Sequence, residues 1–142
     1  MRSASGRCDR PTLTDVLPVA GLVLLSFLLS SIPGQKIPPV PVWQFDKLVH
    51  ASLFGVLGLL LARPLARPGL GLGVGAQVFA AMCLASAWGA LDEMHQLFTP
   101  NRSCDVRDWV ADTVGALLGA LLLLAWRRWR AAAAPTRAEA RP

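Results

Sequence analysis

Four apolar segments, at or near the length needed to cross a bilayer, dominate the sequence. They cover residues 13–32, 48–62, 70–91 and 109–126. A helix rises 1.5 Å per residue and the hydrocarbon core is about 30 Å thick, so a crossing takes about 20 residues. The second segment is short and must include residues 45–47 at one end and a snorkelling Arg63 at the other. The segments predict an all-α, polytopic membrane bundle of four transmembrane helices.

Charge and composition agree with a membrane protein. Only 16% of the residues are charged, whereas soluble domains average about 25%. The sequence pI is about 10.1, but the basic residues lie between and beyond the apolar segments and form no patch suited to nucleic acid. We therefore expect no nucleic-acid partner. The three cysteines, Cys8, Cys83 and Cys104, fall in different parts of the topology, and we expect no internal disulfide.

The distribution of basic residues predicts the orientation. Ten of the 14 Lys and Arg residues precede the first segment, lie between the second and third, or follow the fourth, and four lie on the other side. The positive-inside rule then places both termini in the cytoplasm. We divide the chain into a basic cytoplasmic tail (1–12), a four-helix membrane domain (13–126) and a second basic cytoplasmic tail (127–142). Cleavage of the first segment as a signal peptide is the less favoured alternative, because no small-residue cleavage site follows it.

Polar residues concentrate on the predicted outer side. Six of the nine acidic residues and both histidines fall there: Asp46, Asp92, Glu93, Asp105, Asp108, Asp112, His50 and His95. A charge at the bilayer centre costs roughly 2.5–3.5 kcal/mol on insertion scales, so such residues usually face protein or a water-filled cavity. These residues are therefore the default candidates for a functional site.

Helical spacing groups these residues further. Asp46 and His50 are four residues apart, Glu93 and Gln96 three apart, and both spacings place a pair on one helix face. In the last segment, steps of three or four residues join Asp105, Asp108, Asp112, Gly115 and Gly119. A Gly-x-x-x-Gly pattern allows close approach of another helix, here more plausibly within the chain than in a dimer.

Each of these residues also has a structural interpretation. Asp46 and Lys47 could form a helix start with an interfacial lysine, Asp105 and Asp108 could cap the last helix, and Asp112 could be a buried hydrogen-bond partner. The functional interpretation predicts that the loop 99–107 folds over the ends of the second to fourth spans. Arg102 would then pair with Asp46, Glu93, Asp105 or Asp108, since unpaired carboxylates near lipid are costly.

The motifs together resemble the VanZ-like integral membrane proteins. They are Asp46-Lys47-Leu48-Val49-His50 followed by Gly55 and Gly58, Glu93-Met94-His95-Gln96, Pro100-Asn101-Arg102, Asp105 with Asp108, and Asp112-Thr113-Val114-Gly115 with Gly119. The resemblance covers about half of the chain, residues 46–119. One position differs, because Asp112 stands where the family pattern has Asn, which puts in doubt a role that needs a neutral amide there.

The resemblance implies a set of substrate-binding residues and a role in the cell envelope. The implied residues are Asp46, Lys47, His50, Glu93, Gln96, Arg102, Asp105 and Asp108. The family is associated with low-level resistance to glycopeptide antibiotics, teicoplanin in particular, which implies a multi-pass protein of the bacterial cytoplasmic (inner) membrane. We expect no cofactor and no metal, and the oligomeric state stays open.

Three functions fit these observations. The first is a protein whose extracytoplasmic polar pocket engages a membrane lipid, a lipid-linked envelope component or an amphiphilic glycopeptide. The second is a membrane-embedded hydrolase or transferase acting on a lipid phosphate, with Glu93, His50 and Asp108 as the candidate catalytic residues. The third is a purely structural module. Whether a reaction is catalysed stays open, and a cavity around His50, Glu93 and Asp108 would favour the first two functions.

Overall fold

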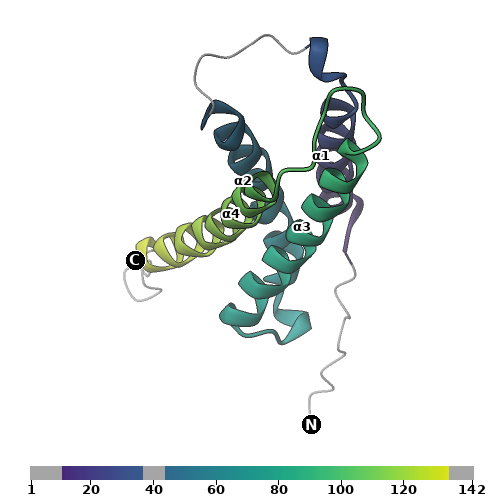
Figure 1. Cartoon of the computed structure of the whole chain (residues 1–142). Helices are drawn as coiled ribbons and strands as arrows, with labels where there is room; N and C mark the ends of the chain where they lie inside the picture. The colour runs from purple at the N-terminus through teal and green to yellow at the C-terminus, as the bar shows by residue number, and fades with distance from the viewer. Residues whose placement is uncertain (1–10, 37–43, 135–142) are drawn as a thin grey trace, which may run out of the picture.

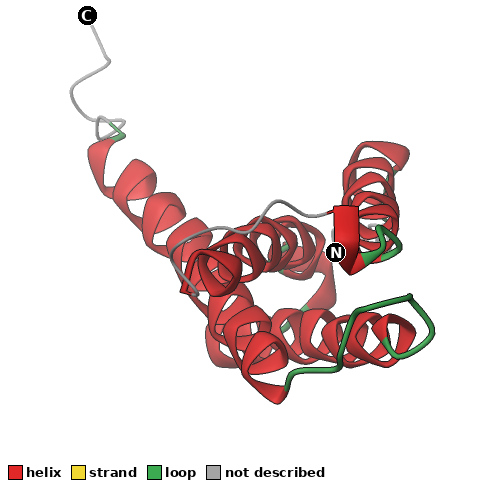
Figure 2. Cartoon of the chain, turned by 45° about the horizontal axis from the view of Figure 1, so that its top comes forward, coloured by secondary structure: helices red, strands yellow, loops and turns green. Residues whose placement is uncertain are grey.

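The computed structural model describes residues 11–36 and 44–134, and in these ranges the chain forms helices and loops without strands (Figures 1 and 2). The elements are α1 (Leu13–Ser30), η1 (Gly34–Lys36), α2 (Gln44–Leu65), η2 (Pro68–Leu70), α3 (Val74–Gln96) and α4 (Val106–Ala133). The four α-helices are long and apolar enough to cross a membrane. This confirms the predicted all-α fold with four membrane-spanning helices.

The starts of the third and fourth helices differ from the sequence prediction by three or four residues. The third helix begins at Val74 and not at residue 70, because Gly71 adopts a left-handed conformation with φ 61° that ends the short turn η2. The fourth helix begins three residues earlier than expected. Asp105 is its N-cap, and its side chain accepts a hydrogen bond of 2.8 Å from the Arg107 backbone N–H.

The closest helix pair is α2 and α4, which cross in the centre of the view in Figure 1. Glycines make this approach possible: a Cβ atom at Gly115 or Gly119 would lie less than 3.0 Å from the carbonyl oxygen of Ala51 or Gly55. Gly58 meets Ala116 in the same way from the other helix. The Gly-x-x-x-Gly pattern therefore packs within the chain, as expected.

Hydrogen bonds between polar side chains attach α1 to α3. The partners lie on one face of each helix and form the pairs Ser26–Trp88 (2.9 Å), Ser30–Asp92 (2.5 Å) and Ser31–His95 (3.0 Å). In each pair the serine hydroxyl meets a polar atom of α3, so the apolar α1 is fixed in register against α3. The structure thus explains the serines that interrupt the first apolar segment.

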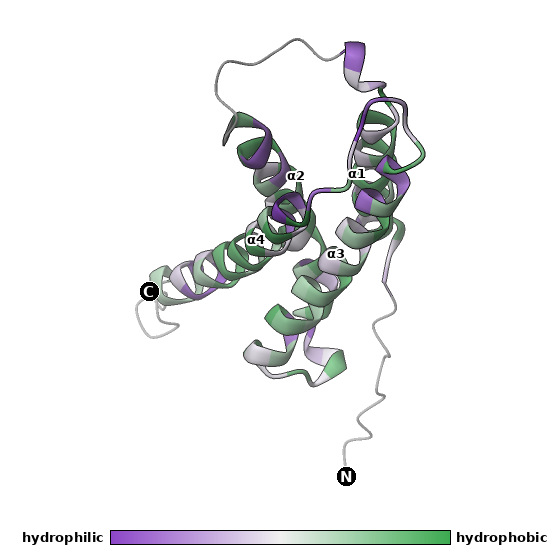
Figure 3. Ribbon diagram, viewed as in Figure 1, coloured by the Kyte–Doolittle hydropathy of each residue, from purple (hydrophilic) through white to green (hydrophobic). Residues whose placement is uncertain are grey.

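The two ends of the bundle have different polar residues (Figure 3). At one end, Asp15 pairs with Arg67 and the Arg127 side chain donates to the carbonyl oxygen of Ala66 at 3.2 Å. At the other end, α2 and α4 begin, α3 ends, and the loop after α3 crosses to α4 (Figure 2). Between the ends, many large apolar side chains are exposed, which suits contact with lipid. The candidate site lies at the second end.

Candidate functional site

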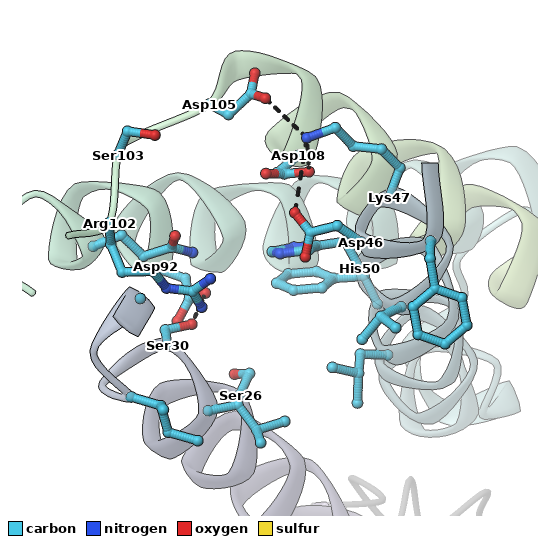
Figure 4. A pocket seen from close by; sticks show the side chains of 18 of the residues that line it. Ser26, Ser30, Asp46, Lys47, His50, Asp92, Arg102, Ser103, Asp105 and Asp108 are labelled. Carbon is cyan, nitrogen blue, oxygen red and sulfur yellow. Dashed lines mark hydrogen bonds and ion pairs between the residues drawn. The ribbon is translucent and has the colours of Figure 1, made fainter. Parts of the chain in front are cut away.

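A cavity of about 740 Å³ lies at the end of the bundle where α2 and α4 begin (Figure 4). One part of its wall is apolar and comes from α1, the turn after it and α2, through Leu29, Ile32, Phe45, Val49, Leu53 and Phe54. The other part is polar and includes Ser30, Lys36, Asp46, Lys47, His50, Asp92, Gln96, Arg102, Asp105 and Asp108. The cavity therefore offers both charged groups and hydrocarbon surface to a ligand.

Lys47 on α2 holds two carboxylates of α4. Its ammonium group donates to Asp105 Oδ2 at 2.8 Å and to Asp108 Oδ1, and Asp46 lies 4.0 Å away (Figure 4). Asp108 is buried, whereas the Asp105 side chain is 39% exposed. The hydrogen bond from Lys47 and the backbone N–H of Arg107 lower the pKa of Asp105 below its ordinary value. Where α2 and α4 begin, at the cavity, the two helices are therefore joined by a cluster of ion pairs.

The predicted pairing of Arg102 with an acidic residue of this set is wrong. In the described part of the chain, Arg102 forms no ion pair, and Lys47 holds Asp105 and Asp108 instead. The loop folds toward α1: Thr99 donates to the Ser30 carbonyl at 3.3 Å and Gly34 N–H to the Pro100 carbonyl at 3.0 Å. This position directs the Arg102 side chain into the cavity.

Two atoms facing this region are buried and have no hydrogen-bond partner among the described residues. They are Arg102 Nε and Asp92 Oδ1, whose side chains lie close together beside Ser30 in Figure 4. The other Asp92 oxygen accepts from the Ser30 hydroxyl, and Asp92 is only 2% exposed. Buried polar groups are usually paired, so these two atoms are available for a ligand or for water.

A second polar group lies behind the cavity wall. The ring of His50 contacts Asp112 through its Nδ1 atom, 3.0 Å from Asp112 Oδ1, which bears out the interpretation of Asp112 as a buried hydrogen-bond partner. Glu93 accepts from the Asp105 backbone N–H at 2.8 Å and from the Gln96 side chain at 3.1 Å. Asp112 is fully buried and Glu93 is 2% exposed. These contacts join α2, α3 and α4 beneath the cavity.

The structure brings the eight predicted residues to one end of the bundle. Seven of them line the cavity, and Glu93 lies behind the wall, bonded to Asp105 and Gln96. Sequence reasoning left Ser30 and Asp92 out of the predicted set. The sequence groups Asp92 with the other acidic residues that lie at this end of the bundle, but a serine within an apolar helix carries no signal that it faces a polar partner.

Fold and site together define a class: an all-helical membrane protein with a polar cavity at one end of a four-helix bundle. The chain belongs to the VanZ/LLP1 family, because the model of that family matches residues 12–127. This match confirms the resemblance seen in the sequence motifs. The chain has no significant match among curated proteins or among solved structures.

Proposed function

We propose that the cavity binds the anionic head group of a membrane amphiphile, such as a lipid-linked component of the cell envelope, while its hydrocarbon chain stays in the bilayer. The observation that carries the proposal is Arg102 Nε, a buried donor without a partner in the described part of the chain, at the edge of a cavity with both polar and apolar walls. A guanidinium group recognises phosphate through charge-assisted hydrogen bonds.

An apolar groove on α2 supports an amphiphilic ligand. The groove has a volume of about 380 Å³ and shares Phe45, Val49 and Leu53 with the cavity. It continues along the helix to Val56, so that the apolar surface runs from the polar cavity toward the middle of the membrane span. A head group in the cavity would leave its hydrocarbon chain along this groove, where apolar burial stabilises it.

The proposal places the cavity on the extracytoplasmic side of the bacterial cytoplasmic membrane. Its basis is the split of ten basic residues to four. Arg67 and Arg127 lie at the end of the bundle opposite the cavity, near the start of α1. From this side the protein could also engage an amphiphilic glycopeptide such as teicoplanin.

A second candidate function is a membrane-embedded hydrolase or transferase for a lipid phosphate. It is favoured by His50, which lines the cavity and whose ring is oriented by Asp112. An imidazole held by a carboxylate is a common acid–base arrangement. Glu93 and Asp108 are the other candidate catalytic residues of this function.

A cellular experiment tests the proposed function. Wild type, Arg102→Ala and Glu93→Gln are expressed at equal membrane levels, with Arg130→Ala as the matched control at the opposite end of the bundle, where it stacks on Trp126. Teicoplanin susceptibility and the lipid recovered with the purified protein are measured. We expect Arg102→Ala to lose both the bound lipid and the effect on teicoplanin susceptibility, and Arg130→Ala to keep both. Equal lipid content in Arg102→Ala and wild type would contradict the proposal, and a Glu93→Gln variant that retains lipid but loses the phenotype would favour the enzyme.

A further inference from the structure

A buried group of one histidine and two carboxylates lies where α2, α3 and α4 meet. His50, Glu93 and Asp112 each offer one ligand atom, and the three atoms lie within 4.8 Å of one another. His50 contributes its imidazole from the cavity side, whereas both carboxylates are almost completely buried. We infer that this group binds one divalent cation of the first transition row, such as Zn²⁺ or Mn²⁺.

The two carboxylates of the group have only His50 as a partner of opposite charge among the described residues. In the described part of the chain, neither Glu93 nor Asp112 forms an ion pair with a lysine or an arginine, and Lys47 is held by Asp105 and Asp108. Even a protonated His50 would leave one net negative charge. Burying unpaired charge is costly, and a bound divalent cation removes this cost.

An unsatisfied oxygen is an independent indication of a ligand. Asp112 Oδ2 is buried and has no hydrogen-bond partner within residues 11–36 and 44–134, although Oδ1 contacts His50. This oxygen faces α3 at Gly89, where a Cβ atom would lie 3.0 Å from it. Glu93 follows Gly89 by one helical turn and thus projects from the same face of α3. The free oxygen is therefore directed to the side from which Glu93 approaches.

The ligand types and their support also fit a metal centre. Imidazole with carboxylates suits Zn²⁺, Mn²⁺ and related ions. Tetrahedral bonds of about 2.0–2.2 Å place ligand atoms about 3.3–3.6 Å apart, so any pair of these atoms near the 4.8 Å limit must move about 1 Å closer when the ion binds. Glu93 is oriented by the Asp105 backbone N–H and by Gln96, the kind of outer contact that holds metal ligands in place. Three protein ligands leave a coordination position open toward a water or a ligand atom.

A neighbouring group is the weaker candidate. Asp46, His50 and Asp108 also place ligand atoms within 4.8 Å of one another. Asp108, however, already forms an ion pair with Lys47, and Asp46 is exposed to solvent. Among the described residues the inner group has no lysine or arginine partner, and its two carboxylates are almost completely buried, so the cation is assigned to it.

The cation site has a consequence for the cavity. The lining of the cavity carries four aspartates against two lysines and one arginine. A divalent cation beside His50 would add positive charge next to an anionic head group. This consequence rests on the proposed function, whereas the cation site itself does not.

Metal binding to the detergent-purified full chain tests the inference in the absence of added lipid. The chelator-treated protein is titrated with Zn²⁺ and with Mn²⁺ by calorimetry, and its thermal unfolding is followed at each concentration. We expect one equivalent per wild-type chain and a rise in unfolding temperature with metal concentration. His50→Asn and Glu93→Gln should each weaken binding by at least about tenfold.

His95→Asn is the matched control, because His95 contacts Ser31 and Phe27 outside the group. It should bind as wild type does. The inference is overturned if chelator-treated wild type neither binds these ions stoichiometrically nor gains stability from them. It is also overturned if Asp46→Asn abolishes binding while Glu93→Gln leaves it unchanged. Because no lipid is present, failure here leaves the proposed head-group binding intact.

Discussion

The close crossing of α2 and α4 gives a quantitative prediction for a single added methyl group. In Gly119→Ala the new Cβ atom overlaps the backbone carbonyl of Gly55, which cannot rotate away as a side chain could. In Gly21→Ala, on α1, the new Cβ atom has no neighbour within 4 Å. The two variants carry the same chemical change in a helix, so they separate the packing effect from helix propensity.

The expected changes in the free energy of unfolding have opposite signs for the two variants. Replacing Gly by Ala inside a helix favours the helix by about 1 kcal/mol. Overpacking costs typically 1–3 kcal/mol, and the rigid carbonyl places Gly119 near the upper value of about 3 kcal/mol. We thus expect Gly119→Ala to lose about 2 kcal/mol of unfolding free energy and Gly21→Ala to gain about 1 kcal/mol.

Thermal unfolding in one detergent, followed by circular dichroism, measures the effect. Gly119→Ala should unfold several degrees below wild type, and Gly21→Ala at or above it. If Gly119→Ala is as stable as wild type, α2 and α4 do not cross at this glycine, and the reasoning about the α2–α4 contact is refuted.

Two further predictions concern orientation and pH. In intact cells, an impermeant thiol reagent should modify the exposed Cys104 and leave Cys8 unmodified, and the reverse result would invert the proposed topology. Lys47 depresses the pKa of Asp105 in the folded protein, so this ion pair stabilises the fold above the ordinary pKa of 3.8, and the contribution is lost as the pH falls through the depressed value. The difference in unfolding temperature between wild type and Asp105→Asn should therefore shrink in acid, and a difference that does not change with pH would contradict the assignment.

The four membrane-spanning helices and the buried face of α4 could be predicted from the sequence. Apolar length alone predicts four spans, and the step of three or four residues places Asp108, Asp112, Gly115 and Gly119 on one face, all buried as expected. The start of α3 was missed by four residues, because the left-handed Gly71 depends on a turn conformation that hydropathy does not report.

The partners within the site were harder to predict. Spacing shows which residues share a helix face, but it does not show which faces of different helices meet. The sequence predicts Lys47 as a ligand-binding residue, yet the α2–α4 crossing brings it to Asp105 and Asp108, two of the four acidic residues predicted as alternative partners of Arg102. The contact of Ser30 with Asp92 likewise depends on the position of α1 against α3.

Direct binding of a defined lipid is the sharpest test of the proposed role of the cavity. Native mass spectrometry of the detergent-purified chain, titrated with a phosphate lipid and with a neutral lipid of the same chain length, would count bound molecules. We predict one phosphate lipid per wild-type chain, little neutral lipid, and binding weakened about tenfold or more in Arg102→Ala but not in Arg130→Ala, as expected for loss of a charge-assisted contact of about 1.5–3 kcal/mol. Equal retention of the two lipids, or unchanged phosphate-lipid binding in Arg102→Ala, would contradict the claim that this cavity recognises an anionic head group.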